Sequence, residues 1–70
     1  MEHGYRGHLI RLVEGALWSA ELIDLRTGTL LPTSASATPS EGLEVCAERA
    51  RDLVDLYLEG EARLGERHGH

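Results

Sequence analysis

The stretch GALWSAELIDL, residues 15–25, carries the chain's single tryptophan and has apolar side chains at both odd and even positions. Successive residues of a β-strand point to opposite faces, so the stretch divides into two apolar sets. One set is Trp18, Ala20 and Leu22, and the other is Leu17, Ile23 and Leu25. A two-layer domain of 70 residues buries one face of its sheet, so the second set predicts a further covering surface.

Two more strands are predicted around this stretch. Residues 6–14 (RGHLIRLVE) are rich in apolar residues and stop at Glu14-Gly15, with Leu9 and Val13 on one face. Residues 29–37 (TLLPTSASA) follow a turn in which Gly28 can adopt a positive φ. Pro32 has no N–H for a ladder bond, so this strand is predicted at a sheet edge. Residues 1–5 are polar, and we expect them to be frayed.

The segment TPSE, residues 38–41, predicts the start of a helix. Thr38 serves as N-cap, Pro39 takes the first helical position, and Glu41 completes a capping box. The helix is expected to run to about Glu59, with Gly60 just past its end and residues 61–70 frayed. Its predicted core face is Leu43, Cys46, Ala47, Ala50, Leu53, Val54, Tyr57 and Leu58. The opposite face is acidic, and a mixed strip of Val45, Arg49 and Leu56 lies between them.

These elements predict an α+β fold with the order β-β-β-α. It has a three-stranded antiparallel sheet with one C-terminal helix packed on one face. Residues 1–70 form a single small domain. A chain of this size buries roughly 60% of its unfolded surface and is marginally stable alone. No disulfide can support it, because Cys46 is the single cysteine. Oligomerisation is one of the remaining ways to stabilise so small a core.

Residues 5–59 resemble HicB-like antitoxin domains. The resemblance rests on a first strand with Tyr5, the pattern GALWSA over residues 15–20, the pair Ile23-Asp24, and the helix opening TPSE. It implies a partial RNase-H-like or double-stranded-RNA-binding-like fold and a role in interaction. The chain departs from the family in two ways. It has DLRTGT where the family usually has a proline-glycine pair, and we expect no room after Glu59 for the C-terminal DNA-binding segment that many members carry.

Composition narrows the classes of partner. The net charge is −5 and every basic residue is arginine, a composition that disfavours binding to phosphate backbones and is typical of a GC-rich genome. The lone cysteine, an N-terminus (MEHGYRGHL) without an apolar core, and the lack of a long apolar run predict a cytoplasmic protein without a membrane span.

Candidate catalytic groups do not assemble into a recognised site. Cys46 lies on the predicted core face, so we expect a buried, unreactive thiol. His3 has the position of an amino-terminal copper or nickel chelate, as any third-position histidine does, and His8 is expected to be a sheet residue. His68 and His70 lie on the predicted frayed tail. We therefore expect neither catalysis nor a cofactor nor a metal.

The sequence thus predicts a non-enzymatic interaction module that forms a homodimer, with an antitoxin-like or regulatory role. Sheet faces and edge strands are both open as routes to the dimer. The predicted interface residues are Leu9, Val13, Leu17, Trp18, Ile23, Leu25 and Leu56. A predicted acidic face for docking a basic protein comprises Glu44, Glu48, Asp52 and Asp55. The alternative is a nucleic-acid-binding domain that uses the open sheet face with Arg6, Arg11 and Arg26.

Overall fold

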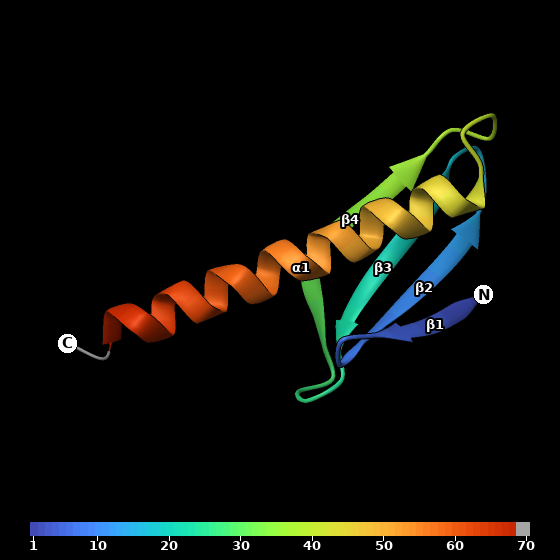
Figure 1. The fold of residues 1–70 in the computed structure, drawn as a ribbon. Helices are drawn as coiled ribbons and strands as arrows, with labels where there is room; N and C mark the ends of the chain where they lie inside the picture. The colour runs from blue at the N-terminus through green and yellow to red at the C-terminus, as the bar shows by residue number, and fades with distance from the viewer. Residues whose placement is uncertain (69–70) are drawn as a thin grey trace.

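Four strands precede one helix in the computed structural model, which describes the backbone of residues 1–68 and the side chains of residues 1–62. The elements are β1 (Glu2–Tyr5), β2 (His8–Glu14), β3 (Trp18–Asp24), β4 (Thr29–Ala37) and α1 (Leu43–His68). The strands form one antiparallel sheet in the order β1-β2-β3-β4, and α1 lies across one face of it (Figure 1). The α+β class and the C-terminal helix are confirmed, but the sheet has four strands where three were predicted.

Strand β1 is the element that the sequence did not predict. Arg6 and Gly7 have φ values of 49° and 76°, so they make a two-residue turn of the kind that joins tight hairpins. Arginine seldom adopts a positive φ, so Arg6-Gly7 is a weak sequence signal for such a turn. The hairpin pairs Tyr5 with His8 and Glu2 with Arg11. The N-terminal segment is therefore a paired edge strand and not a frayed end.

Strand β4 covers residues 29–37 as predicted, and Pro32 lies on this edge strand. The register shifts at Pro32. Glu21 pairs with Ser34 and Ile23 with Leu30, so residues 31–33 lie opposite the single residue Leu22. A proline without a ladder donor is tolerated at such a bulge.

The core lies between the sheet and the N-terminal half of α1. Ile10, Ala20 and Leu22 from the middle strands are completely buried, as are Cys46, Ala50 and Val54 of the helix. Leu43, Leu53, Tyr57 and Leu58 pack partly buried around them, so the predicted core face of the helix is confirmed. Many of the facing residues are alanine or cysteine, and small side chains allow the helix to approach the sheet closely.

The capping box forms, but it closes a separate turn ahead of the helix. The backbone N–H of Thr38 donates to Glu41 Oε1 over 2.9 Å, and the N–H of Glu41 donates to Thr38 Oγ1 over 3.2 Å. Gly42 then has a φ of 89°, which interrupts the helical path, and its carbonyl accepts the Cys46 N–H. The helix therefore begins at Leu43 and not at Pro39.

The helix also continues past its predicted end. Gly60 lies inside α1, whose backbone is helical to His68, so the helix ends later than predicted, and residues 69–70 lie outside the described part. Figure 1 shows the C-terminal half of α1 extending beyond the sheet. Of the described residues, none form a helix with the length and apolar character that a bilayer span requires.

Candidate functional site

The face of the sheet opposite α1 carries three rows of side chains, which follow from the strand register. The apolar row, nearest the β1–β2 and β3–β4 turns, is Gly4, Leu9, Ile23 and Leu30. The charged row is Glu2, Arg11, Glu21 and Ser34. The outer row is Val13, Ser19 and Ser36. We call this surface the open face.

Large apolar side chains remain accessible on the open face. Leu30 is 56% exposed and Val13 is 47% exposed, while Leu9 and Ile23 are half-buried. Leu25, beyond the end of β3, is 58% exposed. Within the charged row, Arg11 Nε lies 2.9 Å from Glu2 Oε2 and Arg11 Nη1 lies 3.9 Å from Glu21 Oε2. The open face is therefore apolar at the end near the turns, charged across its middle, and lined by Val13 and two serines at the other end.

The structure brings together part of the predicted interface. Leu9, Val13 and Ile23 share the open face, and Leu17 is exposed in the β2–β3 loop. Trp18 alternates with Ala20 and Leu22 and packs against the core, on the helix side of the sheet. Leu56 is exposed on α1. Leu30 was missed, because the bulge at Pro32 sets its pairing with Ile23 and no sequence pattern reveals that register.

A polar cluster ties both turns at this end of the sheet to the helix. Asp55 Oδ1 accepts hydrogen bonds from Tyr5 Oη at 2.9 Å and from Arg6 Nη1 at 2.7 Å. Arg26 Nη2 lies 3.2 Å from Asp24 Oδ2 and 3.3 Å from Glu61 Oε1. The arginine of each turn thus reaches a carboxylate of α1.

These contacts shift the pKa values of the carboxyl groups in the cluster. The Arg26 guanidinium and backbone N–H hold the pKa of Asp24 below its usual range. The hydrogen bonds from Arg6 and Tyr5 lower the pKa of Asp55. Both groups are held in the charged state by neighbours that also fix the helix, so a role in helix attachment accounts for the cluster.

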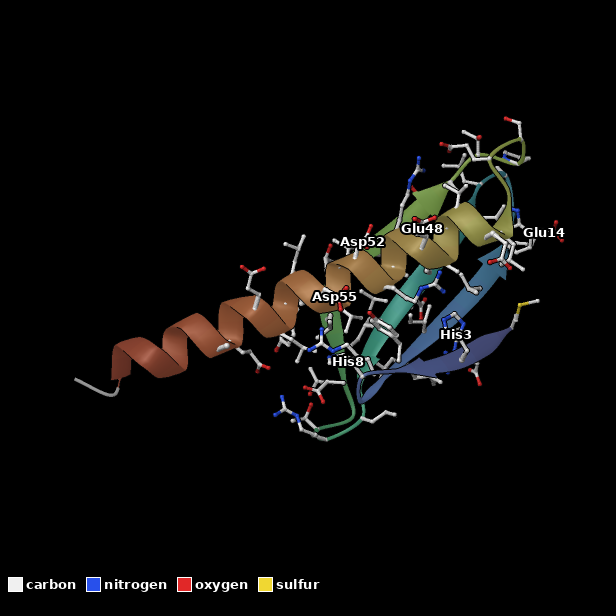
Figure 2. All side chains as sticks on the ribbon, viewed as in Figure 1. His3, His8, Glu14, Glu48, Asp52 and Asp55 are labelled. Atoms are coloured by element: carbon white, nitrogen blue, oxygen red, sulfur yellow. The ribbon has the colours of Figure 1, made fainter. Side chains whose placement is uncertain are left out.

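His8 and Asp24, paired across β2 and β3, are the buried polar residues among the described side chains. His8 Nδ1 donates to the Arg6 carbonyl over 3.0 Å, and its Nε2 is buried without a hydrogen-bond partner. The ring meets Tyr57 edge-on at 6.0 Å between centroids. Figure 2 shows His8 under the middle of α1, close to the β1–β2 turn. A histidine beside an aspartate suggests acid–base chemistry, but both side chains are covered by the helix.

A small cleft lies between α1 and the first two strands. Its volume is about 200 Å³, below the roughly 300–1,000 Å³ of small-molecule sites. The cleft is lined by Met1, His3, Leu12, Leu43, Glu44, Ala47 and Arg51. The described side chains contain no cluster of histidine, cysteine, aspartate or glutamate that could hold a metal ion. Cys46 is buried as predicted, and burial raises the pKa of its thiol, which makes it a poor nucleophile.

The predicted acidic face divides into free and engaged carboxylates. Glu44, Glu48 and Asp52 are exposed, whereas Asp55 is bonded to Tyr5 and Arg6. Figure 2 shows Glu48 and Asp52 on successive turns of α1. Asp55 therefore serves the fold and is not available to a partner as predicted.

Arg49 of the mixed strip shields the free edge of β4. Its Nη1 donates to the Ser36 carbonyl over 3.0 Å and to Glu41 Oε1 over 3.1 Å. Pro32 has no N–H to offer further along the same edge. An edge strand that lacks a donor and has a carbonyl already bonded is a poor template for another strand.

Comparison with known proteins adds no functional assignment: no family model, no curated protein and no solved structure matches the chain.

Proposed function

We propose that this chain is a small non-enzymatic interaction module that forms a homodimer through the open face of its sheet. The observation that carries the proposal is the set of exposed and half-exposed apolar side chains on that face, namely Leu9, Val13, Ile23 and Leu30, with Leu25 exposed in the adjacent β3–β4 turn. Monomeric proteins seldom expose contiguous apolar patches, and a symmetric dimer covers such a patch with its own copy. The antitoxin-like or regulatory role implied by the resemblance to HicB-like domains is part of the same proposal.

Face-to-face association is favoured over the joining of edge strands. The β4 edge has Pro32 in its middle and Arg49 on its Ser36 carbonyl. The other edge, β1, is four residues long. Neither edge offers a long run of free backbone groups, whereas the open face offers side chains from all four strands.

The alternative function, nucleic-acid binding, finds little support in the arginines. Arg6, Arg11, Arg26 and Arg49 are each ion-paired with a carboxylate. Arg11 lies on the open face between Glu2 and Glu21, so its charge is already balanced. A phosphate backbone needs cationic side chains that are free to replace its counterions. A gel shift at low salt with RNA and DNA tests this alternative, and tight salt-sensitive binding would favour it.

Sedimentation equilibrium over a range of micromolar concentrations tests the dimer. The monomer mass is 7.7 kDa, and we expect twice that mass at the upper concentrations. Leu30→Ser should shift the equilibrium to the monomer. Leu56→Ser is the matched control, because Leu56 is similarly exposed (62%) but lies on the helix, and it should leave the dimer intact. A monomer mass throughout, or equal effects of the two variants, would contradict the proposal.

A further inference from the structure

The three rows of the open face have an order that restricts how two copies can stack. From β1 to β4, the apolar row reads Gly4, Leu9, Ile23, Leu30, and the charged row reads Glu2, Arg11, Glu21, Ser34. Two identical sheets that stack face to face are related by a two-fold axis lying between them. This axis can run along the strands or across them, and each direction brings different rows together.

We propose that the axis runs along the strands, between β2 and β3, so that β2 of each chain lies over β3 of the other. This inference rests on the proposed homodimer and names its arrangement. Each row then faces the same row of the second copy in reversed order. The central charged pair becomes Arg11 against the partner's Glu21, and it occurs twice by symmetry.

The other positions of the two rows are complementary as well. In the apolar row, Leu9 faces the partner's Ile23, and Leu30 faces the partner's Gly4, which has no side chain to compete for the space. In the charged row, the carboxylate of Glu2 faces the partner's Ser34, whose hydroxyl can donate a hydrogen bond. In these two rows, apolar groups meet apolar groups or glycine and each charge meets a group of suitable polarity, whereas in the outer row Val13 faces the partner's Ser19.

An axis across the strands produces the opposite result. When it passes through the charged row, at the middle of the open face, it places this row on itself without reversal, so Arg11 faces the partner's Arg11 and Glu21 faces the partner's Glu21. Like charges that face each other across an interface oppose association. This arrangement is therefore less favourable than the one with complementary charges. The same axis places the apolar row over the outer row, where Ile23 faces the partner's Ser19. Charge complementarity therefore selects the axis along the strands.

Thiol cross-linking distinguishes the two axes. Stacked sheets lie about 10 Å apart and neighbouring strands about 4.8 Å apart, so the axis along the strands places residue 9 about 11 Å from the partner's residue 9. The same spacing holds for residue 13 and the partner's residue 13. Residues 9 and 13 are four residues apart along β2, an offset of about 13 Å along the strands, which lengthens the distance between residue 9 and the partner's residue 13 to about 17 Å.

The experiment mixes an L9C chain with a V13C chain that carries a tag to change its size. A bifunctional maleimide spanning about 11 Å, the distance set by the sheet and strand spacings, is then added. The gel resolves 9–9, 13–13 and mixed 9–13 products. The wild-type chain is the control, because its Cys46 thiol is buried and should not react. Sedimentation equilibrium of each variant establishes beforehand that it forms dimers.

We expect the 9–9 and 13–13 products to form and the mixed product to be largely absent. A predominant 9–13 product would overturn the axis along the strands while leaving the homodimer in place. Dimers in sedimentation that give none of the three products would also overturn this arrangement, since both thiols would then lie outside the interface. A monomer mass for the wild-type chain would overturn the homodimer itself, and with it this inference.

Discussion

The two faces of strands β2 and β3 differ in burial and in the arrangement of their apolar side chains. On the covered face, Ile10, Ala20 and Leu22 are completely buried under the helix. On the open face, Leu9 and Ile23 are separated from Val13 by the row that holds Arg11. An apolar surface, with the buried polar pair His8 and Asp24 at one end, forms the folding core. An apolar surface that is crossed by charged side chains can face water in the monomer, and its charges make binding specific. This is the pattern expected of an association surface.

The largest difference between the faces should appear at neighbouring positions of β3. Leu22→Ala should lower the free energy of unfolding by about 2–5 kcal/mol, because it leaves a cavity in a fully buried site. Ile23→Ala should cost about 1 kcal/mol or less when measured at concentrations where the chain is monomeric. Urea denaturation of both variants gives the comparison. Equal losses would mean that the open face is a second core of the monomer.

On the helix, the difference in stability between a buried and an exposed position should be smaller. Val54 is completely buried against the sheet, whereas Leu56, two residues later, is exposed. Val54→Ala should cost about 1–3 kcal/mol through partial cavity formation, and Leu56→Ala should stay within about 0.5 kcal/mol of the wild type. Thermal unfolding followed by circular dichroism is sufficient to measure the difference. An unchanged melting temperature for Val54→Ala would contradict the placement of the helix.

The turn at residues 38–41, ahead of the helix, should contribute less to the free energy of unfolding than the buried helix residues do. Thr38→Ala removes the hydroxyl that accepts the Glu41 N–H, and we expect a loss of about 0.5–1 kcal/mol, at the lower end for capping residues. The lower end is expected because the box closes a turn before Gly42 and not the helix itself. Thr38→Ser keeps the hydroxyl and should restore most of the stability. A loss as large as that of Val54→Ala would show that the turn helps to hold the core.

Sequence patterns predicted the elements that depend on local periodicity and missed those that depend on register. The helical core face from Leu43 to Leu58 follows a period that tertiary contacts do not alter, and it was confirmed. Strand β1 was missed because its turn uses Arg6 at a positive φ, which is a weak signal. Leu30 was missed because its position across from Ile23 depends on the bulge at Pro32.

Asp55 illustrates the same limit for the acidic face. Its position on the helix placed it in the predicted acidic face, but Tyr5 and Arg6 reach it only because the β1–β2 hairpin exists. The open face itself was anticipated from the apolar residues at both parities. Which parity meets the helix was settled by packing, since Ala20 and Leu22 are buried in one cluster with Ala50 and Val54.

Acid should weaken the turn at Glu41 through its shifted pKa. Hydrogen bonds from the Arg49 guanidinium and from the backbone N–H of Thr38 lower the pKa of Glu41 from 4.5 to about 2. Since the folded pKa lies below the unfolded one, this stabilisation is complete above about pH 5 and is lost as the pH falls toward 2. Urea denaturation across that range should show the decline.

Glu41→Gln should remove its share of this pH dependence, while Glu48→Gln, at an exposed position, should leave the slope unchanged. Asp24 and Asp55 also have lowered pKa values, so part of the acid sensitivity should persist in Glu41→Gln. An identical slope in wild type and Glu41→Gln would show that the contact with Arg49 does not persist in solution.

The smallest effect is expected where the helix faces solvent, farthest from both sheet faces. Glu48 and Asp52 are exposed and lie four residues apart on α1, where like charges repel by about 0.2–0.5 kcal/mol. Changing both, to Gln and Asn, should therefore leave the fold intact and raise its stability by about that amount. Asp55→Asn is the matched control three residues after Asp52, and it should lower stability because it weakens the bonds from Tyr5 and Arg6. Chemical denaturation of the two variants measures the contrast, and sedimentation equilibrium should show that the double variant still dimerises. If the double variant instead lost stability or dissociated, these carboxylates would belong to an interface and the association surface would extend beyond the open face.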